Sequence, residues 1–194
     1  MPPLYSLLLI GGKSTRMGSD KSLLDYYGQP QWLHNLSLFE GLVEKIFISV
    51  RKGQIIDFPN IIEDKQLGLG PFGAILSAME TFPDKAFLVF AVDIPFLNQT
   101  NLKKLVENRS IDYNAIAFKS KFKNYPEPLA CIWEPKMLPI LQNSFLKENY
   151  KLTNILKNTN VLTIEVDDYL IQNINTPEEY IESKKIIDLN KPKK

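Results

Sequence analysis

Histidine and cysteine are almost absent from the sequence: His34 and Cys131 are the only residues of their types among 194. A single cysteine excludes an intrachain disulfide and any zinc site rich in cysteine. Catalysis by a Ser-His-Asp or Cys-His arrangement would have to use His34. This residue lies in the segment WLHNLSLF, whose spacing predicts an amphipathic helix, so we expect it to serve in packing or at the surface.

An excess of charge of one sign and a long apolar run are missing as well. The chain has 23 Lys and Arg against 22 Asp and Glu, a formal net charge of +1. General nucleic-acid binders usually show a basic excess, so we expect no nucleic-acid partner. No apolar run approaches the roughly 20 residues of a transmembrane helix, and the first residues lack the features of a signal peptide. We therefore expect no membrane association and a cytoplasmic location.

What the sequence does contain is an alternation of short apolar runs with helical patterns. Up to about residue 95, strands alternate with helices, which predicts βαβ units on a parallel sheet and an α/β fold. We expect a single domain over 1–190 and a tail, 191–194, that frays. The expected strands are 7–10, 45–50, 61–64, 86–92, 113–118, 129–133 and 161–166; the expected helices are 31–42, 72–82, 99–107, 135–141, 146–157 and 177–187.

The stretch Leu7–Leu24, LLLIGGKSTRMGSDKSLL, joins a buried strand to a glycine-rich, cationic loop. Glycines let a backbone approach an anion, and the cations Arg16 and Lys21 compensate its charge, so this form is typical of a phosphate-binding turn. Neither G-x-x-x-x-G-K-[ST] nor G-x-G-x-x-G is present, which excludes a P-loop and a dinucleotide fingerprint.

A second glycine-rich loop, at residues 68–73, precedes the expected helix 72–82. This loop is consistent with two interpretations. It could form a tight turn with a close contact to the helix, or it could contact a ligand at the helix N-terminus. Basic residues in the segment 119–127 are more typical of a solvated loop than of a site.

Two carboxylates follow predicted strands, Asp64 after the third and Asp93 after AFLVFAV. Ligands of parallel sheets bind beyond the carboxyl ends of the strands, so both should lie at the same edge as the loop 11–21. Burying a carboxylate at the end of an apolar strand costs free energy unless the carboxylate binds a metal or pairs with a cation. Alternatively, Asp93 in the pattern D-x-P could cap a turn. With Mg²⁺ at Asp93, this edge suits a nucleoside triphosphate, whose transferred phosphoryl group Arg16 and Lys21 would neutralise.

Five segments in order resemble a known family. LLLIGGKSTRMGSDKSLL closely resembles the nucleotidyltransferase signature L-A-G-G-x-S-x-R-M-G-x-D-K, and its two glycines with D-K are similar to MobA-like molybdenum cofactor guanylyltransferases. The family's G-P-L-x-G, D-x-P-F, E-P-L-x-x-x-Y and N-x-N-T-P-E-[DE] are similar to four later segments: GPFG at 70–73, DIPF at 93–96, EPLACIW at 127–133 and NINTPEE at 173–179.

The resemblance implies a Rossmann-like three-layer nucleotidyltransferase fold with a mostly parallel sheet. It implies a Mg²⁺-dependent enzyme that transfers GMP from GTP to the terminal phosphate of molybdopterin, already loaded with molybdenum, and releases pyrophosphate. Other cofactor-biosynthesis proteins and acceptor molybdoenzymes would be further partners. The implied catalytic residues are Arg16, Lys21 and Asp93, with Asp93 on the metal; the nucleotide-binding residues are Leu9, Ile10, Gly11, Gly12, Lys21, Asp64, Gly70 and Asp93; Glu127, Pro128, Asn173 and Asn175 would lie near the pterin.

Three segments depart from the family. It usually has Ala at Ile10 and often Asn near Arg51, so no guanosine contact is carried over to Arg51, and GPFGA at 70–74 differs by one residue from the family's commonest sequence. A cytidylyltransferase for the same cofactor, or a sugar-phosphate nucleotidyltransferase, remains an alternative. These relatives usually carry L-A-A-G or L-A-G-G with K-P in place of D-K, so Gly11-Gly12 and Asp20-Lys21 favour guanine. A non-catalytic nucleotide-binding relative is an alternative of a different class.

Overall fold

The structure is a computed structural model that describes residues 1–10 and 20–190. Three residues of the expected nucleotide loop, Gly11, Gly12 and Arg16, lie outside the described residues. So does the expected frayed tail, 191–194.

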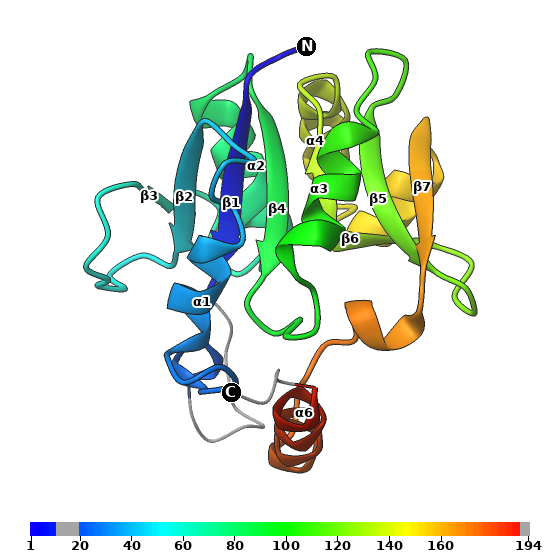
Figure 1. The fold of residues 1–194 in the computed structure, drawn as a ribbon. Coiled ribbons are helices and arrows are strands. Elements are labelled where there is room, and N and C mark those ends of the chain that lie inside the picture. The colour runs from blue at the N-terminus through cyan, green and yellow to red at the C-terminus, as the bar shows by residue number, and fades with distance from the viewer. Residues whose placement is uncertain (11–19, 191–194) are drawn as a thin grey trace.

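Seven strands form one sheet in the order β3-β2-β1-β4-β6-β5-β7 (Figure 1). All neighbouring pairs are parallel except those of β6, which runs antiparallel to β4 and β5. This confirms the mostly parallel sheet. The strands are β1 (Leu4–Leu9), β2 (Lys45–Val50), β3 (Ile61–Glu63), β4 (Ala86–Ala91), β5 (Ala115–Ser120), β6 (Pro126–Trp133) and β7 (Val161–Val166).

The reversal of β6 follows from the length of the connection before it. Only residues 121–125 separate β5 from β6. A parallel crossover needs about a dozen residues or more, whereas a short loop returns the chain as an antiparallel neighbour. The segment 119–127, expected as an exposed loop, is thus partly strand, with only 121–124 fully exposed.

Helices cover both faces of the sheet, which gives three layers (Figure 1). Helices α1 (Gln31–Ser37) and α3 (Gln99–Glu107) pack on one face. Helices α2 (Pro71–Thr81), α4 (Met137–Leu146) and α5 (Leu152–Lys157) pack on the other. In β1, Leu4 and Leu8 join the first core cluster while Tyr5, Leu7 and Leu9 join the second, so the strand is buried on both sides. Strands buried on both faces are near-continuous apolar runs, and in β1 only Ser6 interrupts the run.

Several helix boundaries differ from those expected. The helix expected over 31–42 ends at Ser37 and continues as turns, and its buried positions include the amide pair Gln31 and Asn35, while Leu33 is exposed. The Gln31 amide donates to Asn35 at 2.9 Å, so this polar pair is partly satisfied inside the protein. The helices expected at 135–141 and 146–157 are shifted to Met137–Leu146 and Leu152–Lys157.

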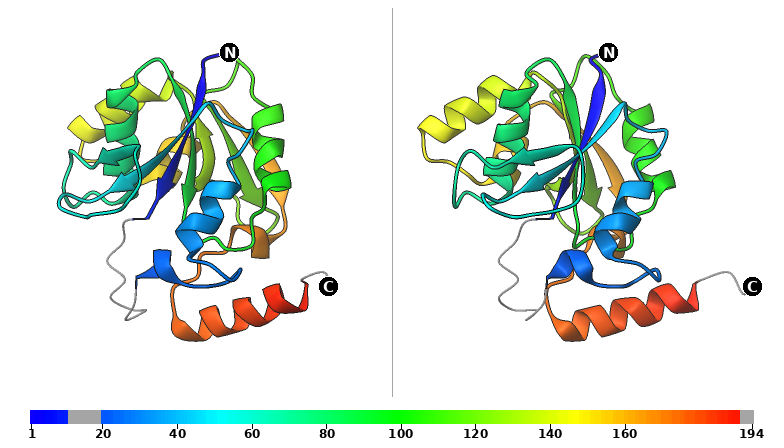
Figure 2. Two further views of the ribbon diagram at one scale, coloured as in Figure 1. Left: turned by 60° about the vertical axis from the view of Figure 1, so that its left-hand side comes forward. Right: turned by 90° about the vertical axis from the view of Figure 1, so that its left-hand side faces the viewer.

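The last helix, α6 (Pro177–Leu189), lies outside both helical layers, below the carboxyl ends of the strands (Figure 2). It follows the short helix η2 (Asp168–Ile171), and it lies beside the segment that includes η1 (Lys21–Leu23). Across the described residues, no helix combines the length and apolar character that crossing a bilayer would require.

Candidate functional site

Lys21 and Asp93, which are 72 positions apart in sequence, form an ion pair at the carboxyl edge of the sheet. Asp93 follows β4, and its Oδ2 accepts a hydrogen bond from Lys21 Nζ at 3.1 Å. The two side chains are 17% and 20% exposed, so solvent reaches the pair without separating it. The structure therefore brings together the two described residues that the sequence predicted to be catalytic.

Two asparagines complete this cluster. The Oδ1 of Asn175 accepts from Lys21 Nζ at 2.7 Å, and the Nδ2 of Asn173 donates to Asp93 Oδ1 at 2.9 Å. The backbone N–H of Ile174 donates to the carbonyl of Asp93 at 2.8 Å. The resemblance assigns Asn173 and Asn175 to the pterin, and in the structure both amides contact the predicted catalytic pair.

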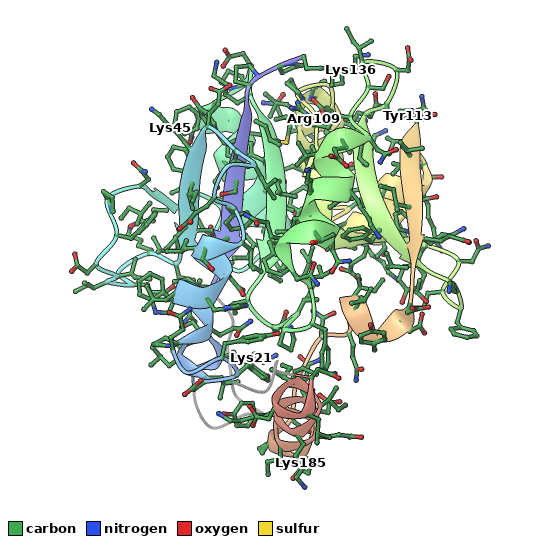
Figure 3. All side chains as sticks on the ribbon, in the orientation of Figure 1. Lys21, Lys45, Arg109, Tyr113, Lys136 and Lys185 are labelled. Carbon is green, nitrogen blue, oxygen red and sulfur yellow. The ribbon has the colours of Figure 1, made fainter. Side chains whose placement is uncertain are left out.

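The local structure around Lys21 explains why an aspartate precedes it. Asp20 is the N-cap of η1, and its Oδ1 accepts from the backbone N–H and the hydroxyl of Ser22 at 2.9 and 2.8 Å. Asp20 thereby fixes the turn from which Lys21 extends, as capping aspartates do. Figure 3 shows Lys21 between this turn and α6.

Asp64 lies at the same edge, two strands away from β1. Its backbone N–H donates to the carbonyl of Val50 at 3.0 Å, and its Oδ1 accepts from the hydroxyl of Ser49 at 2.8 Å. Burial raises the pKa of the Asp64 carboxyl, while the Ser49 hydrogen bond and the charge of Arg51 oppose this shift. Ser49 is a residue that the sequence reading missed, and its only signal is a hydroxyl within the apolar strand KIFISV.

Glu127 is a second carboxylate in the neighbourhood of Asp93. It lies on β6, and its Oε1 accepts from the backbone N–H of Leu129 at 3.1 Å. Burial raises the pKa of Glu127, and the negative charge of Asp93 adds to this shift, whereas Lys123 opposes it. The adjacent Pro128 is buried, and its carbonyl accepts from the indole N–H of Trp133 at 3.2 Å.

The second glycine-rich loop forms the entry to α2. Gly70 is the N-cap of this helix at φ +56°, a backbone conformation that favours glycine, and Pro71 follows in the first turn. Because α2 follows β3, its N-terminus and the partial positive charge there belong to the same edge of the sheet. A close packing contact also requires Gly73, so the turn and the helix contact that the sequence allowed are both present.

The end of β1 is held by backbone hydrogen bonds. The carbonyl of Leu9 accepts from the N–H of Val92 at 3.1 Å, and the side chains of Leu9 and Ile10 are buried in the two core clusters. Ile10 packs on the side of the sheet covered by α1 and α3. The backbone of this strand end is therefore fixed directly beside Asp93.

The described residues suit a metal ion that arrives with a nucleotide better than one held by the protein alone. Within 1–10 and 20–190, no group of three or more His, Cys, Asp or Glu side chains is arranged to hold a metal. Asp93 offers one carboxylate, and each of its oxygens accepts one hydrogen bond from the described residues, although a carboxylate oxygen has two lone pairs. Mg²⁺ is commonly bound by one or two carboxylates together with substrate phosphates, so the donor set fits.

Comparison with known proteins agrees with this arrangement. The family model described as a MobA-like NTP transferase domain matches residues 6–163. A molybdenum cofactor biosynthesis bifunctional protein of Synechocystis sp. is 32% identical over 184 residues, which cover 92% of this chain and 53% of that protein. The chain thus spans about half the length of this relative. A probable molybdenum cofactor guanylyltransferase of Flavobacterium johnsoniae is 27% identical over 183 residues, which cover 92% of this chain and 95% of the relative.

A solved structure has the same fold. The molybdopterin-guanine dinucleotide biosynthesis protein A of Archaeoglobus fulgidus superposes with a TM-score of 0.74 over 95% of this chain and 99% of that one, at 22% identity. The superposition confirms the expected nucleotidyltransferase-like α/β fold.

Proposed function

The chain belongs to the family of MobA-like NTP transferase domains, and from this we propose that it transfers GMP from GTP to the terminal phosphate of molybdopterin. The single observation that supports this most strongly is the cluster of Lys21, Asp93, Asn173 and Asn175 at the carboxyl edge of the sheet. In the proposed reaction, an oxygen of the acceptor phosphate bonds to the α-phosphorus of GTP. The bond between that phosphorus and the bridging oxygen of the β-phosphate breaks, and pyrophosphate leaves.

Lys21 and Asp93 compensate each other's charge in the nucleotide-free protein. A bound triphosphate offers Lys21 a new anionic partner, and Asp93 would then hold Mg²⁺, which neutralises charge on the triphosphate and on the leaving pyrophosphate. Asn175 and Asn173 keep the two charged groups oriented throughout. Arg16, outside the described residues, would add positive charge on the phosphate side.

Asp64 is suited to contact the nucleoside part of GTP. The Ser49 hydroxyl holds one of its oxygens, so the direction of the carboxylate is fixed before a nucleotide binds. The N-terminus of α2, entered through Gly70, adds backbone N–H groups to the same edge. Glu127 and Pro128 lie on the β6 side of Asp93, where we place the acceptor. The cytoplasm stays the expected compartment.

Nucleotide binding by calorimetry tests the choice of base. The full chain is titrated with GTP, CTP and ATP in the presence of Mg²⁺, and we expect GTP to bind with the highest affinity. Equal or tighter binding of CTP would overturn the guanylyltransferase proposal in favour of a cytidylyltransferase. The same titration with Lys21→Met should weaken GTP binding at least about tenfold, because charge-assisted hydrogen bonds contribute about 1.5–3 kcal/mol.

A further inference from the structure

Helix α6 contacts the backbone at Asp25, four residues after Lys21. The hydroxyl of Tyr180 donates to the carbonyl of Asp25 at 2.9 Å, and Lys184 Nζ donates to the same carbonyl. The ring of Tyr180 also meets the buried ring of Tyr26 edge to face, with 4.9 Å between their centroids. Since Tyr180 and Lys184 are four positions apart, they lie on one face of the helix and act on a single peptide group.

The N-terminus of the same helix holds the residue that contacts the Lys21 ammonium group. Glu179 Oε2 accepts from the backbone N–H groups of Asn175 and Thr176 at 2.6 and 3.1 Å. The Thr176 hydroxyl accepts from the N–H of Glu179 in return, which completes a capping box. The side chain of Asn175 then accepts from Lys21 at 2.7 Å.

We propose that α6 positions the Lys21 ammonium group for the triphosphate of the nucleotide, with Tyr180 and Lys184 as positioning residues. The proposal rests on the proposed function, in which Lys21 contacts that triphosphate. The helix contacts the chain on two sides of the lysine: it binds the carbonyl of Asp25, four residues after Lys21, and it holds Asn175, which accepts from the ammonium group. A long flexible side chain held in its bound orientation loses less freedom on binding, which raises affinity without a new contact.

This helix lies beyond residue 163, where the match to the family model ends. Figure 3 shows Lys21 above α6, with Lys185 on the lower side of the helix away from it. Lys185 is therefore a matched control for Lys184: the two are neighbours with the same charge, and only Lys184 reaches the segment after Lys21.

The test is a double-mutant cycle on GTP affinity, measured by calorimetry on the full chain with Mg²⁺. Lys184→Met removes the donor, together with its 3.9 Å ion pair to Oδ1 of Asp25, and keeps most of the apolar stem, whereas Tyr180→Phe removes only the hydroxyl. Each change should weaken GTP binding about fivefold, the effect of one lost hydrogen bond. In a Lys21→Met background the same changes should have no effect, since they act through Lys21. Lys185→Met should leave GTP affinity unchanged in both backgrounds.

Three results would overturn the proposal. One is an unchanged GTP affinity in both Lys184→Met and Tyr180→Phe. Another is an equal loss with and without Lys21, because that pattern indicates a general structural role. The third is a wild-type chain that does not bind GTP, which would overturn the proposed function as well, whereas the first two leave it standing. Thermal unfolding of each variant identifies any loss of fold, and Lys184→Met, an exchange at a partly exposed position, keeps the test valid if Tyr180→Phe is unstable.

Discussion

His34, the only histidine, stacks on a tyrosine that holds the loop after Asp93. The rings of His34 and Tyr27 lie 3.8 Å apart between centroids with an interplanar angle of 14°. The Tyr27 hydroxyl donates to the carbonyl of Pro95 at 2.7 Å. Burial lowers the pKa of His34 from its usual value of 6.5, so the folded protein favours the neutral ring. This agrees with the packing role expected from the sequence.

The lowered pKa of His34 predicts an acid-sensitive fold. As the pH falls below 6.5, the unfolded chain binds a proton at His34 before the folded chain does, so the free energy of unfolding decreases. His34→Phe retains a ring for Tyr27 and removes this titration. Urea denaturation between pH 8 and pH 5 should therefore show a steeper decline for the wild type than for His34→Phe. Parallel curves would contradict the assignment.

Arg109 and Glu134 form a buried ion pair beside Pro2, at the end of the sheet opposite to Lys21 (Figure 3). Arg109 Nε and Nη2 donate to the two oxygens of Glu134 at 2.7 and 3.0 Å, and Nη2 also donates to the carbonyl of Pro2 at 3.0 Å. Their side chains are only 9% and 5% exposed. Glu134→Gln leaves a buried guanidinium without its counter-charge and should lower the free energy of unfolding by about 3 kcal/mol.

An exposed pair offers the control for this prediction. Lys103 and Glu107 are 3.5 Å apart on α3 and about 60% exposed, so Glu107→Gln should change stability by no more than about 0.5 kcal/mol. Urea denaturation at neutral pH measures both variants. A similar small effect for Glu134→Gln would show that solvent or another acceptor compensates the buried guanidinium.

Among the elements, α2 depends on a glycine inside the helix. A Cβ at Gly73 would lie 2.7 Å from the carbonyl oxygen of Gln66 and 3.3 Å from Leu69 Cβ. Helix propensity alone would make Gly73→Ala stabilising by about 1 kcal/mol. The contact with backbone should reverse the sign and destabilise the protein by about 1–3 kcal/mol, as overpacking does. Urea denaturation measures the free energy of unfolding of both proteins. A more stable Gly73→Ala variant would contradict the tight packing of Gln66 and Leu69 on α2.

Two strands and one helix, α3, have the bounds expected from the sequence, whereas β1 and β6 each begin three residues before the expected start. β2 and β7 match their expected ranges, Lys45–Val50 and Val161–Val166, because a short apolar run between turns has few alternatives. α1 is shorter than expected because the chain after Ser37 forms turns with hydrogen bonds between residues three apart, although the hydrophobic spacing continues to Leu42. The start of β5 differs by two residues, within the usual uncertainty of element ends.

At the scale of the whole molecule, the candidate site is assembled from distant parts of the chain. From the sequence we predicted that Asp64, Asp93 and the loop containing Lys21 lie at the carboxyl edge of the sheet. The hydrogen bond between Lys21 and Asp93 confirms that these two residues lie together there. The hydrogen bond between Lys21 and Asn175 spans 154 positions, and no local pattern predicts such a contact. The contact of Ser49 with Asp64 and the contacts of α6 with Asp25 were not predicted for the same reason.

Transfer of labelled GMP tests the central proposal most directly. The full chain is incubated with Mg²⁺, molybdopterin and GTP labelled at the α-phosphate, and dinucleotide and pyrophosphate are measured together. We predict one pyrophosphate per labelled dinucleotide, and a rate lowered by about a hundredfold or more in Asp93→Asn, because an electrostatic contact at the transferred group is lost. A wild-type chain that forms no guanine dinucleotide, or Asp93→Asn with full Mg²⁺-dependent turnover, would contradict the account.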